Sequence, residues 1–394
     1  MAAFDPAAAT AAYMATLPAT GHAKASAYTH GGYWLLLWGW LVAVAAAWLI
    51  VRSGAIVRAE TALERKKPRL ILVSMVAAAI YTVADFALEL PWQAYATWWR
   101  ERAYGLSGQA FAGWFAERLI EMVLTVVITA LFVAALYALI RGAGRAWWLW
   151  AGATAAVFLI LIQILAPVFI LPLFNTYTPA PPGPVRDAVV ALAVKAGVPH
   201  DKIYIFNGSK QSNRYTANVA GLGGTARVAM SDVMFRRGSD LAEVRGVVAH
   251  EMGHYKRGHI VWGTLANAVL AVATFGLIAL AFPWAARMMG AGGVSIADPA
   301  GLPVIMALVL TLIFLATPIT NSLTRLAEAD ADSFSLRIAN EPDGLSRALV
   351  KTVEYRASSP SDLEEFIFYS HPSVEHRVRK AMDWKAAHMG EGPH

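Results

Sequence analysis

The chain has 394 residues, of which 57% are hydrophobic and only 15% are charged, so it is more apolar than an ordinary soluble domain. It contains no cysteine, which excludes disulfides and thiolate metal ligands and leaves His, Asp and Glu for any metal site. The formal net charge of +6 fits a membrane protein with basic loops and argues against a nucleic-acid partner.

Six apolar stretches are each long enough to cross a bilayer as a helix, so the sequence predicts a mainly α-helical, polytopic membrane protein. Residues 1–32 precede them as a tail that lacks the basic segment and apolar core of a cleaved signal peptide. Pro167 and Pro172 are expected to kink or end the fourth stretch. The stretches cover about residues 33–51, 70–92, 120–140, 146–174, 260–284 and 303–324.

Three acidic residues fall within these stretches. Asp85 and Glu89 stand one helical turn apart in the second, and Glu121 opens the third. Because an ionised group is costly in hydrocarbon, their side chains are expected to face the protein interior or water. They indicate either a polar chamber or hydrogen bonds between helices.

Two regions are polar enough to lie in water, at residues 175–249 and 328–394. The first is expected to begin with a proline-rich linker and to contain a helix at 185–196 and a strand at 202–206. A hairpin of strands 217–222 and 225–230, turned by Gly223 and Gly224, follows. The second region is expected to be mainly helical, with a loop near Ser358-Ser359-Pro360. The predicted organisation is therefore a tail (1–32), four spans (33–174), a peptidase region (175–259), two spans (260–327) and a helical C-terminal part of the peptidase domain (328–394).

The motif His-Glu-x-x-His occupies residues 250–254, where the first polar region runs into the fifth apolar stretch. On a helix, His250 and His254 lie one turn apart and point the same way, so both can bind one metal ion. Glu251 can then take a proton from a water activated by that ion. This is the arrangement of a zinc peptidase with its site at the membrane boundary.

The residues before the motif predict the helix that it requires. Ser239 or Asp240 can cap the N-terminus of this helix. Apolar side chains recur at helical spacing at Val244, Val247 and Val248. The alternative is a solvated helix with two unrelated histidines, but this context favours one Zn²⁺ per chain.

A catalytic zinc needs a third protein ligand. On a continuous helix, His259 would turn away from the other two imidazoles, so it is not expected to be a ligand. Glu328 follows the sixth span and shares a helix face with Asp332, whereas Asp330 points elsewhere. Glu328 could bind the metal while Asp332 accepts the N–H of a ligating histidine. The spacing alone leaves open an acidic helix start that complements the helix dipole.

Several separate motifs resemble the type I CAAX prenyl endopeptidase family of integral-membrane zinc metalloproteases. HEMGHYKRGH (250–259) is similar to its metal motif, and EADAD (328–332) to its Glu-x-x-x-Asp segment. Further similar segments are LPW (90–92), which is followed by Tyr95, KIYIFNGSKQSNRYTANVAG (202–221) and YSHPSVEHR (369–377). Together they span roughly residues 70–385, and the combination is highly specific. Val219 departs from the family, in which an aromatic residue usually follows the Asn-Ala pair.

The resemblance implies roles for individual residues. It implies Glu328 as the third zinc ligand and Asp332 as the partner of a ligating histidine. It also implies that Asn218 contacts the substrate backbone, that His371 stabilises the oxyanion and that Arg377 adds charge nearby. From the residues alone, the last three could instead be a turn residue, a loop corner and a solvated helix charge.

The sequence thus predicts a zinc-dependent endopeptidase with a gluzincin-like domain that carries a small β-sheet. Its expected partners are membrane lipid and a peptide or protein substrate, including one with a C-terminal or lipid-modified segment. The substrate stays open, because bacteria generally lack the prenylation that eukaryotic family members depend on. One alternative is a broad-specificity quality-control protease of the heat-shock type. Another is a non-catalytic membrane carrier or scaffold.

The expected location is the inner membrane of a bacterium, because the chain is short and rich in alanine. The loop at 52–69 holds six basic residues, and Arg141 and Arg145 lie in the next loop on the same side. The positive-inside rule would put these loops in the cytosol and the peptidase region outside. The family resemblance instead implies a cytosolic peptidase region, and we follow the resemblance.

Overall fold

A computed structural model describes residues 4–65, 67–214, 216–220, 227–236 and 240–389. Six helical segments in these ranges are long and apolar enough to cross a membrane, which confirms the predicted polytopic, mainly α-helical fold. They are α2 (Ala19–Ser53), α4 with α5 (Leu70–Gln93, Arg100–Ala103), α6 (Phe111–Gly142), α7 with α8 (Trp147–Leu165, Leu171–Phe174), α12 (His259–Met289) and α13 (Leu302–Ala339).

Two of these segments are interrupted where proline removes a helical hydrogen bond. Pro91 lies inside α4, and a π-helical stretch at Ala94–Trp99 follows before α5. Pro167 lies in a second π-helical stretch, Ala166–Ile170, which joins α7 to α8. The helix ends at Phe174, two residues after Pro172, so both prolines act as the sequence predicts.

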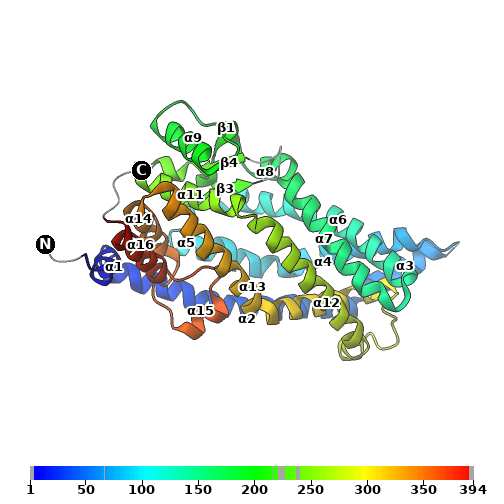
Figure 1. Cartoon of the computed structure of the whole chain (residues 1–394). Coiled ribbons are helices and arrows are strands. Elements are labelled where there is room, and N and C mark those ends of the chain that lie inside the picture. The colour runs from blue at the N-terminus through cyan, green and yellow to red at the C-terminus, as the bar shows by residue number, and fades with distance from the viewer. Residues whose placement is uncertain (1–3, 66, 215, 221–226, 237–239, 390–394) are drawn as a thin grey trace.

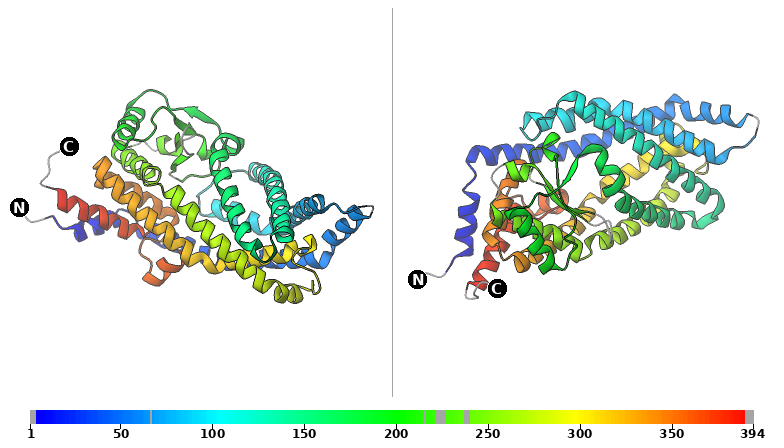
Figure 2. Two further views of the ribbon diagram at one scale, coloured as in Figure 1. Left: turned by 45° about the vertical axis from the view of Figure 1, so that its right-hand side comes forward. Right: turned by 90° about the horizontal axis from the view of Figure 1, so that it is seen from above.

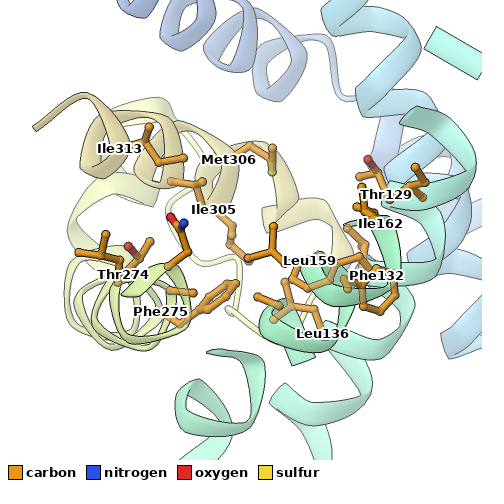
Figure 3. Close-up of a pocket in the computed structure, with 18 of the residues that line it drawn as sticks. Thr129, Phe132, Leu136, Leu159, Ile162, Thr274, Phe275, Ile305, Met306 and Ile313 are labelled. Atoms are coloured by element: carbon orange, nitrogen blue, oxygen red, sulfur yellow. The ribbon is translucent and has the colours of Figure 1, made fainter. Parts of the chain in front are cut away.

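The membrane helices pack around one apolar core, and α7 and α12 approach each other closely at Gly152. A Cβ atom added at Gly152 would lie 2.2 Å from Val272 Cγ2 and 2.8 Å from Val272 Cα, so only glycine fits there. Beside this contact, α6, α7, α12 and α13 line an apolar cavity of about 500 Å³ (Figure 3). Its wall includes Phe132, Leu159 and Phe275.

A second, polar cavity of about 200 Å³ lies between α4 and α6. Asp85, Glu89 and Glu121 line it together with Arg118, which forms an ion pair with Glu121. The three acidic residues therefore face one polar cavity between two helices, which lowers the cost of placing ionised groups at membrane depth.

The polar region expected at residues 175–249 contains a four-stranded mixed sheet in the order β1-β2-β4-β3. The predicted hairpin strands pair antiparallel, with Ala217 opposite Met230 and Val219 opposite Val228; the turn between them lies outside the described residues. The sequence did not predict β1, which forms within the proline-rich linker and pairs with β2. The elements are β1 (Tyr177–Pro179), α9 (Pro184–Ala196), β2 (Ile203–Phe206), β3 (Ala217–Ala220), β4 (Arg227–Ser231) and α10 (Val233–Arg236).

The motif lies on α11 (Leu241–Lys256), as predicted. Asp240 caps this helix by accepting a hydrogen bond from the Ala242 N–H, while Ser239 lies outside the described residues. At Gly253 an added Cβ would lie 3.1 Å from the Cα of Ala331, so a glycine inside the motif lets α11 pack directly on α13. This contact brings the two halves of the candidate site together.

The C-terminal part is helical, with a loop at the expected place before Ser361. Its helices are α14 (Pro342–Lys351), α15 (Asp362–Phe368) and α16 (Val374–His388). The predicted N-terminal tail forms α1 (Pro6–Met14) and the first part of α2, and α1 packs on α16. Figures 1 and 2 show α1, α14 and α16 with the small sheet at one end of the molecule, and α3 (Ala55–Glu64) at the other.

Candidate metal centre

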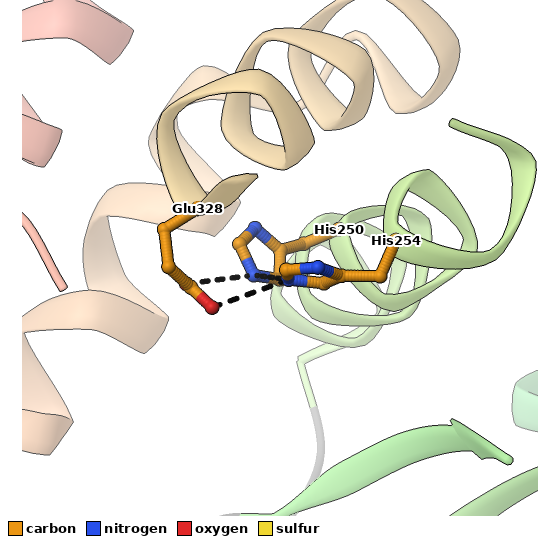
Figure 4. A group of neighbouring side chains, drawn as sticks. All are labelled: His250, His254 and Glu328. Atoms are coloured by element: carbon orange, nitrogen blue, oxygen red, sulfur yellow. Dashed lines mark hydrogen bonds and ion pairs between the residues drawn. The ribbon is translucent and has the colours of Figure 1, made fainter. Parts of the chain in front are cut away.

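Two helices bring together three side chains that could hold a metal ion (Figure 4). His250 and His254 project from α11 with their Nε2 atoms 3.1 Å apart. Glu328 projects from α13, with Oε2 3.2 Å from His250 Nε2 and Oε1 3.3 Å from His254 Nε2. His250 and Glu328 are buried and His254 is partly buried.

The donor atoms fit a tetrahedral zinc site. Four ligands at about 2.1 Å from zinc lie about 3.4 Å from one another. Here the two imidazole nitrogens are 3.1 Å apart, and each lies 3.2 or 3.3 Å from a different oxygen of the Glu328 carboxylate. Glu328 Oε2 is buried and makes no hydrogen bond among the described residues, although a buried carboxylate oxygen normally requires a partner. Two imidazoles and a carboxylate are also a common ligand set for catalytic zinc, with a further position left for water.

The buried side chains of Asp332 and Arg377 contact His250 on the Nδ1 side of its ring, opposite the Nε2 atom. Its Nδ1 lies 2.9 Å from Asp332 Oδ1, so the N–H on that nitrogen donates to Asp332 and leaves Nε2 free to bind a metal. Arg377 donates two hydrogen bonds to Asp332, at 2.8 and 2.7 Å. The Arg377 guanidinium thus lies behind His250, and its Nη2 atom is 3.7 Å from Glu328 Oε2.

Glu251 and His371 lie with His250 and Glu328 on the wall of a cavity of about 440 Å³. His254, the third member of the candidate ligand triad, is not among the residues that line it. Burial raises the pKa of Glu251, against the opposing charge of His250 and His254, which suits a general base. Burial, reinforced by the charge of Arg356, lowers the pKa of His371 to about 3, so its imidazole is neutral at pH 7. Its Nε2 lies 3.4 Å from Glu328 Oε1, and Nδ1 lies 2.9 Å from the Ser370 hydroxyl.

The strand β3 forms one side of this cavity and is an edge of the sheet. Ala217 lines the cavity, whereas Asn218, the next residue along the strand, does not. The amide oxygen of Asn218 is buried and makes no hydrogen bond among the described residues. Asn218 is thus placed beside the cavity wall rather than on it, and His254 and Asp332 are likewise not among the lining residues.

Two further residues lie next to the site, although the sequence predicted a role there for neither of them. His259 contacts His254 on the side away from Glu328, and Asp330 contacts His259. His259 lies apart from the donor atoms of the triad, as expected, but the reason differs, because α11 ends at Lys256 and a new helix begins at His259. The sequence signal for this contact was Gly258, a residue that can end a helix, directly before His259.

Comparisons with known proteins agree with this geometry. Residues 179–385 match peptidase family M48, and residues 7–176 match the CAAX prenyl protease N-terminal region, described as five membrane helices. The uncharacterized metalloprotease YhfN of Bacillus subtilis is 28% identical over 71% of this chain and 66% of its own length, just under two thirds. A CAAX prenyl protease 1 homolog of Arabidopsis thaliana is 27% identical over 74% of this chain and 69% of its own length.

The fold has a solved counterpart. The crystal structure of S. mikatae Ste24p matches with a TM-score of 0.69 at 23% identity, over 83% of this chain and 79% of that one. The M48 match covers more than half of the 394 residues and includes every residue of the triad. This multi-pass membrane protein therefore belongs to peptidase family M48.

Proposed function

We propose that this chain is a zinc-dependent endopeptidase acting at the membrane boundary, with His250, His254 and Glu328 as the zinc ligands. The observation that carries the proposal is the grouping of three candidate donor atoms from two helices, all within 4.8 Å of one another. Glu251 lines the same cavity and supplies the general base that a peptidase needs.

The other side chains have distinct parts in hydrolysis. When bound, zinc supplies Lewis acidity, which makes water nucleophilic near neutral pH and polarises a carbonyl group. Glu251 accepts the proton of the attacking water and returns it to the leaving amine. His371, neutral and donating through Nε2, stabilises the negative charge that develops on the carbonyl oxygen, a contribution of about 3 kcal/mol. Arg377 holds Asp332, and its positive charge lies close to the same region.

The substrate is an extended peptide that adds a strand to the free edge of β3. The position of β3 at the sheet edge and beside the cavity supports this mode of binding. Asn218 would contact the substrate backbone from this strand; its buried amide oxygen makes no hydrogen bond among the described residues. Several relatives are named CAAX prenyl proteases. We therefore propose that the enzyme cleaves within the C-terminal segment of its substrates, including substrates in which that segment is lipid-modified.

The proposed location is the bacterial inner membrane, with the peptidase region in the cytosol. The Bacillus relative supports a bacterial family member, and the six apolar helices support the membrane.

Metal analysis of the purified full-length protein tests the proposal directly. Wild type should carry one zinc per chain and cleave peptides, whereas His254→Ala should lose both the metal and the cleavage. His200→Ala is a matched control, because His200 is exposed in a loop away from the site. Equal metal content in wild type and His254→Ala would overturn the ligand assignment.

A further inference from the structure

His254 has a second polar contact on the side of its ring that faces away from the other zinc-binding atoms. Its Nε2 faces His250 and Glu328, whereas its Nδ1 lies 3.0 Å from Nδ1 of His259. The two rings are 5.0 Å apart between centroids and stand at 74° to each other. His259 therefore meets the edge of His254 that is not available to a metal.

A break in the helix makes this contact possible. Gly258 adopts a left-handed conformation with φ of 68°, which ends the turn after α11 and begins α12 at His259. On an unbroken helix, a residue five positions after His254 would point to another face. The change of direction at Gly258 brings the His259 ring back onto the metal motif.

His259 is anchored in turn by an acidic residue of α13. Its Nε2 lies 3.1 Å from Asp330 Oδ2, and Arg257 donates two hydrogen bonds to the same carboxylate, at 2.8 and 3.0 Å. The His259 side chain is only 13% exposed and the Asp330 side chain is 33% exposed, so this contact is partly buried.

The hydrogen bonds have one consistent direction. A zinc-binding Nε2 needs its lone pair, so the proton of neutral His254 must lie on Nδ1 and be donated to His259 Nδ1. His259 then carries its own proton on Nε2 and donates it to Asp330. These proton positions follow from the requirement at Nε2.

We propose that His259 and Asp330 are positioning residues that hold the tautomer and ring orientation of His254 for zinc. The inference rests on the proposed function, in which His254 is a ligand. It gives both histidines equivalent support, since His250 donates directly to Asp332 and His254 donates to Asp330 through His259. Glu328, Asp330 and Asp332 all lie on α13, so this one helix supplies a ligand and both supporting carboxylates.

Zinc affinity of the purified full-length protein, measured by competition with a chelator, tests this role. His259→Phe keeps an aromatic ring but cannot accept a hydrogen bond, and it should weaken zinc binding about 10- to 100-fold. His259→Gln retains one acceptor and one donor and should recover part of this loss. Asp330→Ala should weaken binding in the same direction, and His200→Phe should bind zinc as wild type does.

A spectroscopic measurement separates positioning from a purely structural role. In the cobalt-substituted protein, the visible absorption bands of Co²⁺ should change in His259→Phe and return toward wild type in His259→Gln. Wild-type affinity and an unchanged cobalt spectrum in His259→Phe would overturn the inference, while the metal loss in His254→Ala would leave the proposed function intact. If wild type and His254→Ala bind zinc equally, the proposed function itself fails, and this inference fails with it.

Discussion

A substitution at Glu251 can test the chemical step independently of metal binding. Glu251 lines the same cavity as His250 and Glu328 but is not one of the three grouped donors. Glu251→Gln keeps the shape of the side chain but cannot accept a proton, so cleavage should fall by a factor of about 10² to 10⁴. The zinc content should remain at the wild-type level. Peptide cleavage and metal analysis on one preparation measure both, and full activity in this variant would contradict the role of general base.

Arg377 and Asp332 form a buried ion pair, in which the side chains are 9% and 2% exposed. Arg377→Met would leave the Asp332 carboxylate buried without its main cationic partner, at a cost of about 3 to 5 kcal/mol in folding stability. Thermal unfolding in detergent should show this as a large fall in Tm.

Helix α16, which contains Arg377, also offers a matched control for this prediction. Arg379 pairs with Asp383 in solvent, with both side chains about half exposed, so Arg379→Met should change stability by less than about 1 kcal/mol. Equal effects of the two substitutions would show that the buried pair has no special importance.

Different site residues were accessible to sequence reasoning to different degrees. The motif and the helix around it suffice for His250, Glu251 and His254, because a short spacing on one helix fixes which side chains share a face. Glu328 lies 74 residues beyond His254, so only the resemblance made it a firm expectation. The contact between His259 and Asp330 depends on the turn at Gly258 and on the packing of α13, and helix periodicity contains neither.

At the scale of elements, the packing of α7 on α12 depends on Gly152. Gly152→Ala would place a methyl group 2.8 Å from the backbone Cα of Val272, which requires the helices to separate. Such overpacking costs about 1 to 3 kcal/mol. We expect a lower Tm in detergent and a smaller yield of folded protein from membranes.

Gly263 provides the comparison, since it lies in α12, the helix that Gly152 of α7 packs against, and an added Cβ there would meet nothing within 4 Å. Gly263→Ala should leave stability unchanged or raise it slightly, because alanine favours the helix. If Gly152→Ala were as stable as Gly263→Ala, the close approach of α7 and α12 would not matter for stability.

The long apolar helices were predictable as elements, whereas several of their ends were not. Hydrophobicity detects the part of α2 and α13 that lies in lipid, but both helices continue into polar sequence, to Ala19 and Ala339. Strand β1 was missed because a segment rich in proline is typical of a linker, and it becomes a strand by pairing with β2. Such tertiary contacts are absent from local sequence patterns.

At the scale of the whole molecule, the number of spans constrains which segments share a side of the membrane. Six spans separate the two ends of the chain, so α1 and α16 must lie on the same side, which agrees with their direct packing. Four spans precede the sheet, so it belongs to that side as well. The basic segment around α3 follows one span and lies at the opposite end (Figure 1).

Because these segments share one side, the membrane orientation has only two possibilities, with the peptidase region either in the cytosol or outside it, and reporter fusions distinguish them. If the peptidase region is cytosolic, green fluorescent protein fused after the C-terminus should fluoresce, and alkaline phosphatase fused there should be inactive. Five spans lie between Lys67 and the C-terminus, so fusions after Lys67 should give the opposite pair of results. The six basic residues of the loop at 52–69 favour the reverse orientation by the positive-inside rule. An active C-terminal phosphatase would therefore show that loop charge sets the topology and that the peptidase site works outside the cytosol.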